Sequence, residues 1–112
     1  MSYTSVFRAG LFAGETHIIT GGGSGIGRCT AHELASLGAH VVLIGRSKEK
    51  LERTAGEITE SGGEVSIYPL DIREEEGVRQ TIKAIVESRG RIHGLVNNAG
   101  GQFPSPLSAI SK

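Results

Sequence analysis

The sequence has little of what builds disulfide-rich, membrane-spanning or nucleic-acid-binding proteins. Its 112 residues include a single cysteine, Cys29, which excludes an internal disulfide framework and a zinc site made of cysteines alone. No run approaches the roughly 20 apolar residues of a membrane span. Twelve basic and twelve acidic residues cancel, so nucleic acid is not an expected partner. The four histidines show no metal-ligand spacing, and we expect no metal site.

The start of the chain lacks the continuous apolar stretch of a secretory signal. We therefore expect a cytoplasmic protein that does not enter a membrane. At this length one domain is the natural expectation. We interpret residues 1–15 as an N-terminal extension and residues 16–112 as a nucleotide-binding half-domain.

Short apolar runs alternate with longer segments of helical period. The runs, rich in branched residues, lie at 17–20, 40–44, 65–70 and 92–96. Helices are expected over 25–37, from a cap at Ser47 to residue 60, and from Glu74 to residue 89. In the first of these helices, the predicted buried stripe is Ile26, Thr30, Leu34 and Leu37. The pattern β-α-β-α-β-α-β predicts an α/β fold: a parallel sheet with helices on both faces.

Glycine is abundant, with 17 residues that cluster rather than repeat. The first strand runs directly into a Gly-x-x-x-Gly-x-Gly loop that opens a helix. Bare backbone and helix N–H groups together favour a bound phosphate. The predicted contacts are Gly21, Ser24, Gly25, Ile26 and Gly27. A flexible glycine loop without a ligand is the alternative.

Two glycines are expected to respond differently to added side chains. A valine at Gly25 would intrude where the loop approaches the phosphate and would abolish cofactor binding. An alanine at Gly63, in a turn after a helix, is expected to have little effect.

The glycine loop and the segment Asn97–Gly100 together resemble the short-chain dehydrogenase/reductase family over residues 7–112. The resemblance implies a Rossmann fold with strand order 3-2-1-4 and a nicotinamide dinucleotide whose pyrophosphate lies over the glycine loop. It also implies that Asn98, Ala99 and Gly100 line the nicotinamide ribose. A plain asparagine-glycine turn is the alternative for this last segment.

The end of the second strand selects between NAD and NADP in such folds. An acidic residue there binds the free ribose hydroxyl, whereas an arginine accepts the 2′-phosphate. Arg46 and Ser47 stand at this point and no carboxylate does, so NADP(H) is favoured over NAD(H). A solvated basic turn is the alternative interpretation.

Asp71 follows the third strand. In relatives an aspartate here accepts a hydrogen bond from the adenine amino group, and the next backbone group, that of Ile72, completes the contact. An aspartate before a glutamate-led helix is also often only an N-cap.

The catalytic pattern of the family is missing. It requires a tyrosine with a lysine four residues later, but Phe7 and Ile72 follow Tyr3 and Tyr68 at that spacing. No catalytic residue is therefore predicted. We expect a truncated, cofactor-binding half that is inactive alone and self-associates through its unpaired fourth strand, whereas the parent enzyme is a homo-oligomer.

The closing segment 100–111 is similar to the trans-2-enoyl-CoA and 2,4-dienoyl-CoA reductase branch of the family. The resemblance implies that the parent enzyme transfers hydride from NADPH to the double bond of an acyl-CoA thioester. A non-catalytic nucleotide-binding module is one alternative. A short-chain carbonyl or alcohol oxidoreductase of another substrate class is the other.

Overall fold

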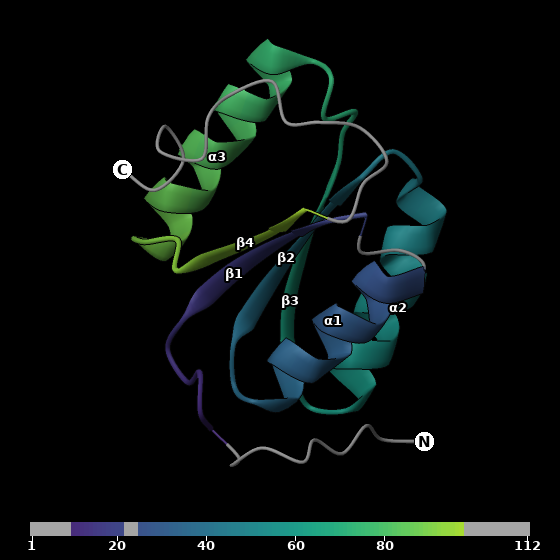
Figure 1. The fold of residues 1–112 in the computed structure, drawn as a ribbon, viewed down its shortest axis with the longest axis vertical. Helices are drawn as coiled ribbons and strands as arrows, with labels where there is room; N and C mark the ends of the chain where they lie inside the picture. Colours follow the sequence, from purple (N-terminus) through teal and green to yellow (C-terminus); the bar gives the residue numbers. More distant parts are fainter. Residues whose placement is uncertain (1–9, 22–24, 98–112) are drawn as a thin grey trace.

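The computed structural model describes residues 10–21 and 25–97, and four strands alternate with three helices within them (Figure 1). The elements are β1 (Thr16–Thr20), α1 (Gly25–Ser36), β2 (His40–Gly45), α2 (Lys48–Glu60), β3 (Glu64–Pro69), α3 (Glu75–Arg89) and β4 (Gly94–Asn97). Each strand falls on one of the predicted apolar runs. The predicted element order is therefore confirmed.

The strands form one parallel sheet in the order β3-β2-β1-β4, as the resemblance implied. Strands β1 and β2 are the central pair, with Thr16 opposite His40 and Thr20 opposite Ile44. Both are almost completely buried, which explains why their sequences are continuous apolar runs rather than alternating ones.

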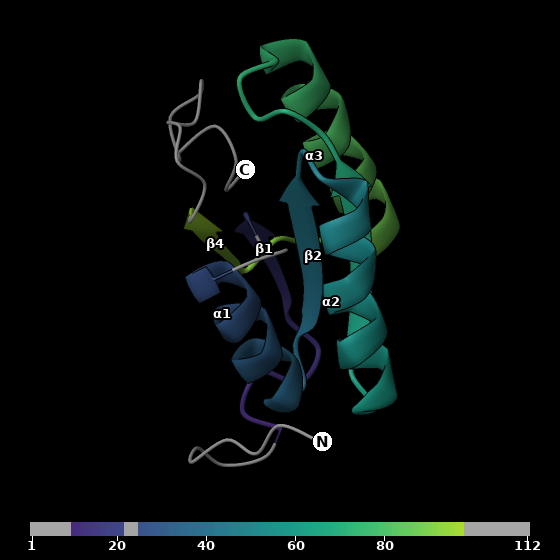
Figure 2. The same ribbon diagram turned by 90° about the vertical axis from the view of Figure 1, so that its right-hand side faces the viewer.

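Helices cover both faces of the sheet. Figure 2 looks onto α1 and α2 with β2 between them, and Figure 1 shows α3 on the opposite side. Each face has its own core cluster. The α1–α2 side buries Ile19, Ala31, Ala39, Val41, Leu43, Leu51 and Ile58, and the α3 side buries Ile18, Val42, Ile44, Ile72, Val78 and Ile85.

The buried face of α1 differs from the prediction. Ile26 was expected to begin the buried stripe, but its side chain is 75% exposed. The residues that the helix buries are Gly27 and Ala31. Both are small, so the helix can approach the sheet closely, and this packing outweighs the hydrophobicity of Ile26 one position earlier.

Two helix starts use different means to satisfy their backbone. Ser47 caps α2 as predicted, because its Oγ accepts a hydrogen bond from the Lys50 amide at 3.3 Å. The N-cap of α3 is Glu74, whose side chain makes no capping bond. The acidic residues of the first turn, Glu75 and Glu76, instead favour the positive end of the helix dipole.

His93, the residue before β4, extends the pairing of β1 with β4 by one residue at the amino edge of the sheet. Its amide donates to the Thr16 carbonyl at 2.8 Å, and its Nδ1 accepts from the Thr16 amide at 3.0 Å. Nδ1 can accept only when it carries no proton, so this bond requires the neutral imidazole with its proton on Nε2. The residue thus takes the place of one further sheet pair at the amino edge.

Gly63 is more constrained than the surface turn that the sequence indicated, while the small effect of alanine there on cofactor binding stays a prediction. A Cβ there would lie 2.7 Å from Cγ2 of Ile58 and 3.1 Å from Cβ of Ala35. Both neighbours belong to the packed α1–α2 side of the core. We now expect Gly63→Ala to lower the free energy of unfolding by about 1–3 kcal/mol through overpacking.

Gly56→Ala is the matched control for Gly63→Ala. Gly56 lies inside α2, and an added Cβ would meet nothing within 4 Å. Alanine there should raise stability by about 0.5–1 kcal/mol because it restricts the unfolded chain. Urea denaturation of both variants measures the difference, and equal stabilities would contradict the close packing at Gly63.

His40 should make stability depend on pH. The side chain is buried, with Nε2 at 2.8 Å from Ser66 Oγ, and burial lowers its pKa. The unfolded chain therefore binds a proton more readily than the folded one, and stability should fall as pH drops below about 6.5. Urea midpoints between pH 5 and 8 measure the slope. The slope should become shallower in His40→Gln, and an unchanged slope would exclude His40 as its source.

Candidate cofactor-binding site

The predicted site residues within the described chain gather at the carboxyl edge of the sheet. Parallel pairing brings the four strand ends together, and backbone hydrogen bonds continue past them. The Gly21 amide donates to the Ile44 carbonyl at 2.8 Å, and the Leu70 amide donates to the Gly45 carbonyl at 2.7 Å. The segments after β1, β2 and β3 are thereby held side by side. Open parallel sheets bind their ligands at this edge.

Three glycines of the predicted phosphate loop, Gly21, Gly25 and Gly27, lie within the described residues. Gly21 and Gly25 have positive φ angles of 69° and 59°, which side chains rarely adopt. A Cβ on Gly25 would meet nothing within 4 Å, so the space beside the start of α1 is open among the described residues. Gly27 is buried, and its small size serves the packing of the helix. Ser24 lies outside the described residues, as do Asn98, Ala99 and Gly100.

Arg46 extends from the end of β2 into solvent. Within residues 10–21 and 25–97, its guanidinium makes no hydrogen bond or ion pair. Its neighbour Ser47 is already engaged as the cap of α2, although its exposed hydroxyl can still donate. Arg46 is thus a cation available to an anionic ligand at this edge.

Asp71 is held by its neighbour Arg73. Its Oδ1 accepts from the Arg73 amide at 2.9 Å, and the Arg73 guanidinium donates to both carboxylate oxygens, at 3.1 and 2.9 Å. These bonds, with a smaller contribution from Arg46, lower the pKa of Asp71 to about 2. The carboxylate is therefore ionised and can only accept hydrogen bonds.

The N-cap interpretation of Asp71 is wrong, because the N-cap of α3 is Glu74, three residues later, and the helix begins at Glu75. Asp71 instead shapes the turn before the helix, where the Glu74 amide donates to the Asp71 carbonyl at 2.9 Å. The next residue, Ile72, has its side chain 6% exposed in the α3 side of the core. That burial fixes the backbone that follows Asp71.

Sequence reasoning did not include Asn97 in the site. Thr20 Oγ1 lies 3.0 Å from Asn97 Oδ1, so the buried threonine hydroxyl donates to the amide oxygen and joins the ends of β1 and β4. This bond orients Asn97 at the same edge as the glycine loop. The signal was available as the first asparagine of the pair that follows the β4 apolar run.

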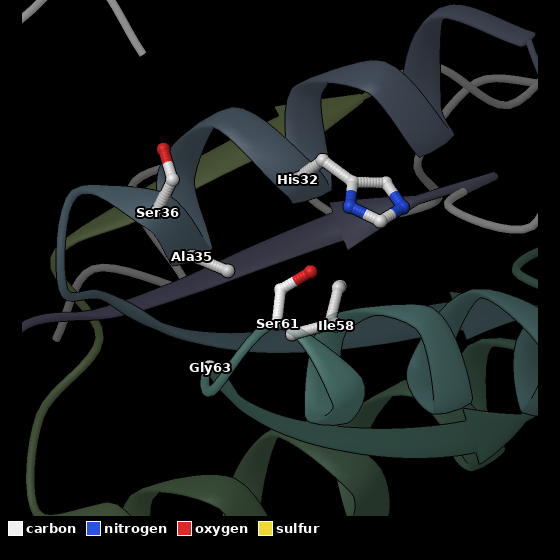
Figure 3. A pocket seen from close by; sticks show the side chains of 6 residues that line it. All are labelled: His32, Ala35, Ser36, Ile58, Ser61 and Gly63. Atoms are coloured by element: carbon white, nitrogen blue, oxygen red, sulfur yellow. The ribbon is translucent and has the colours of Figure 1, made fainter. Parts of the chain in front are cut away.

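A pocket of about 130 Å³ lies between α1 and α2 but far from this edge in the topology (Figure 3). Its lining comes from the last turns of the two helices and the turn before β3: His32, Ala35, Ser36, Ile58, Ser61 and Gly63. These segments lead into the amino ends of β2 and β3, so the pocket belongs to the opposite end of the sheet from the predicted site.

The helices beside this pocket are joined by Glu57 of α2. Its carboxylate accepts from Arg28 Nε at 2.9 Å and lies 2.9 Å from His32 Nε2, both on α1. The bond from Arg28, followed by that from His32, lowers the pKa of Glu57. Glu57 therefore joins α1 to α2 as an ionised carboxylate.

A parallel sheet in the order β3-β2-β1-β4 with helices on both faces is a Rossmann-like α/β fold. The profile described as short chain dehydrogenase matches residues 15–112. The chain belongs to this family, whose members are oxidoreductases that use nicotinamide cofactors.

Relatives with different names are similar to this chain. A Bacillus subtilis protein named "Probable 2,4-dienoyl-CoA reductase" is 40% identical over 94 residues, which are 84% of this chain and 37% of that protein. The structure of the citronellol catabolism dehydrogenase AtuB of Pseudomonas aeruginosa is 66% identical, with a TM-score of 0.85 over 98% of this chain and 45% of that one. The chain thus spans less than half the length of these relatives.

Solved structures of the family hold either cofactor. A metagenomic short-chain oxidoreductase in complex with NADP is 37% identical, with a TM-score of 0.78 over 88% of this chain and 45% of that one. An NAD+-bound xylitol dehydrogenase is also 37% identical, with a TM-score of 0.77 over 81% of this chain and 35% of that one. The fold alone therefore does not select between the two cofactors.

Among the residues that the structure describes, no helix has the length and apolar character needed to cross a membrane. No group of three or more potential metal ligands comes together in these ranges either.

Gly25→Val should abolish cofactor binding, whereas Gly62→Val should not. Both glycines have positive φ angles, 59° and 88°, and both have open space around them. Valine should therefore cost about 1–3 kcal/mol of stability at either position through backbone strain. Only at Gly25 would it also project into the predicted phosphate site. Fluorescence titration with NADPH separates the effects, and equal binding by the two variants would contradict the loop assignment.

Proposed function

We propose that this chain binds the pyrophosphate and adenosine of NADPH. The observation that carries the proposal is the Arg46 guanidinium, which is exposed and unpaired among the described residues at the end of β2. No carboxylate stands beside it on the same turn. A guanidinium is the group best suited to bind a phosphate in two-point fashion, and the absence of an acid removes repulsion of a 2′-phosphate.

In this proposal, the other predicted site residues contact successive parts of the cofactor along the carboxyl edge of the sheet. The pyrophosphate would lie at the start of α1 against Gly21, Ser24, Gly25, Ile26 and Gly27, where helix amides stabilise negative charge. Asp71 and the Ile72 backbone would bind the adenine edge, and Ser47 would donate to the 2′-phosphate. Asn98, Ala99 and Gly100 would line the nicotinamide ribose. The nicotinamide would supply a hydride, while these residues hold and orient it.

For the whole protein we propose reduction of a carbon–carbon double bond in an acyl-CoA thioester. The support is the similarity of segment 100–111 to the enoyl- and dienoyl-CoA reductase branch and the 40% identity with the Bacillus subtilis protein named above. The missing Tyr-x-x-x-Lys pattern remains the reason to expect no turnover from these 112 residues alone. Cytoplasmic location, homo-oligomerisation of the parent and self-association of this chain stay predictions from the sequence.

A second candidate is a dehydrogenase that acts in citronellol catabolism. The observation that favours it is the 66% identity with AtuB, well above the 40% shared with the dienoyl-CoA reductase relative. Full-length protein should be assayed for NADPH oxidation with 2,4-dienoyl-CoA and trans-2-enoyl-CoA thioesters, and for NAD(P) reduction with citronellol. Turnover of citronellol alone would replace the thioester proposal, whereas turnover of the thioesters alone would exclude the second candidate.

Arg46→Asp should shift the preference from NADPH toward NADH. Loss of a charge-assisted phosphate contact costs about 1.5–3 kcal/mol, so the ratio of the two dissociation constants should change at least tenfold. Arg91→Asp, the same change of charge in the exposed segment before β4, is the control and should leave the ratio unaltered. Calorimetric titration of both cofactors measures it, and an unchanged ratio in Arg46→Asp would overturn the NADPH proposal.

A further inference from the structure

One carboxylate at the adenosine end of the edge lies within the influence of two arginines. Asp71 follows β3 and Arg46 follows β2, and the strands are paired up to Gly45 and Pro69. Both Arg73 and Arg46 favour the ionised form of Asp71, with Arg73 the main cause and Arg46 the smallest. Arg73 contacts the carboxylate directly, whereas Arg46 acts only through its charge.

Arg73 binds the Asp71 carboxylate through both its backbone amide and its guanidinium. The two residues are two positions apart, and the backbone amide of Arg73 already donates to the same carboxylate at 2.9 Å. The guanidinium then adds the two-oxygen contact that suits its planar fork. Because the backbone already holds the two residues together, few additional side-chain torsions must be fixed to form the Arg73–Asp71 contact. The lower entropy cost favours this pair over a contact between Asp71 and Arg46 across the strands.

Asp71 and Arg46 directly follow Leu70 and Gly45, whose backbones are joined by a hydrogen bond of 2.7 Å. Without Arg73, Asp71 would be an unpaired carboxylate beside the strand end that carries Arg46. A carboxylate that turns toward Arg46 would compete with a ligand phosphate for the same guanidinium donors. It would also place negative charge close to the 2′-position, where it repels a phosphate but not a hydroxyl. Both effects weaken binding of NADPH specifically. Loss of the proposed Asp71 contact with adenine would weaken NADPH and NADH alike, so the ratio of their dissociation constants isolates the effect at the 2′-position.

We infer that Arg73 is a positioning residue that sets cofactor specificity: by holding the Asp71 carboxylate, it keeps Arg46 free for the 2′-phosphate. The inference rests on the proposed function, because it presumes that Arg46 binds that phosphate. It adds a residue that touches neither the phosphate nor Arg46. Arg73 acts through Asp71 alone, and this distinguishes it from one more positive charge near the cofactor.

The test compares the ratio of NADPH to NADH dissociation constants among variants of the full-length protein. Arg73→Gln should lower the NADPH preference roughly three- to fivefold, the size of a competing ion pair at a protein surface. Arg73→Lys keeps the charge but not the fork, and should also lower the preference. Arg79→Gln is the matched control, because Arg79 is an exposed arginine paired with Glu75 of its own helix at 2.7 Å. It should not change the ratio.

An Asp71→Asn background shows how Arg73 acts. The amide can still accept from the Arg73 backbone, but it has no charge to attract Arg46. Adding Arg73→Gln to Asp71→Asn should then leave the ratio unchanged. A further fall in the ratio would mean that Arg73 acts on the phosphate directly, and would overturn the inference.

The remaining outcomes separate this inference from the proposed function. A wild-type protein that does not prefer NADPH would overturn the proposed function, and the inference with it. A wild-type preference that survives both Arg73 substitutions would overturn the inference alone. Equal weakening of NADPH and NADH by these substitutions would show a purely structural role for the turn, and would also overturn it.

Discussion

The parallel pairing of β3, β2, β1 and β4 determines where the described candidate site residues lie. Because each ladder is parallel, the chain must return to the amino edge after each of the first three strands, and α1, α2 and α3 are these return paths. Gly21, Arg46 and Asp71 therefore lie in strand-to-helix turns at the carboxyl edge. The hydrogen bonds from Gly21 to Ile44 and from Leu70 to Gly45 carry the ladder into these turns.

The two edges of the sheet are consequently built for different purposes. At the amino edge the Thr16 amide donates to His93 and His40 Nε2 lies 2.8 Å from Ser66 Oγ, while His40 Nδ1 faces Glu64 at 3.5 Å without a hydrogen bond. At the carboxyl edge Arg46 is left without a partner among the described residues, and the glycine loop leaves open space at the start of α1. An unpaired cation is a feature that a fold retains where an anionic ligand compensates it.

The features that sequence predicted well are those that depend on neighbours along the chain. The buried strands, the cap at Ser47 and the turn position of Arg46 each follow from a few consecutive residues. The errors arose where distant segments decide. Ile26 is exposed because α1 packs through Gly27, and Gly63 is constrained by Ile58 and Ala35. The Arg73 contact with Asp71 is local, but it depends on the side-chain rotamer of Arg73. The spacing of the two residues in the sequence does not predict that rotamer.

In the proposed function, Asp71 would serve both the turn and the ligand. An ionised carboxylate offers about four acceptor positions. The Arg73 amide and guanidinium take most of these positions. The remaining position is enough for the single donor that an adenine amino group brings. A carboxylate fixed in this way loses no rotamer freedom when the base binds, so the contact with Arg73 prepares the acceptor instead of blocking it.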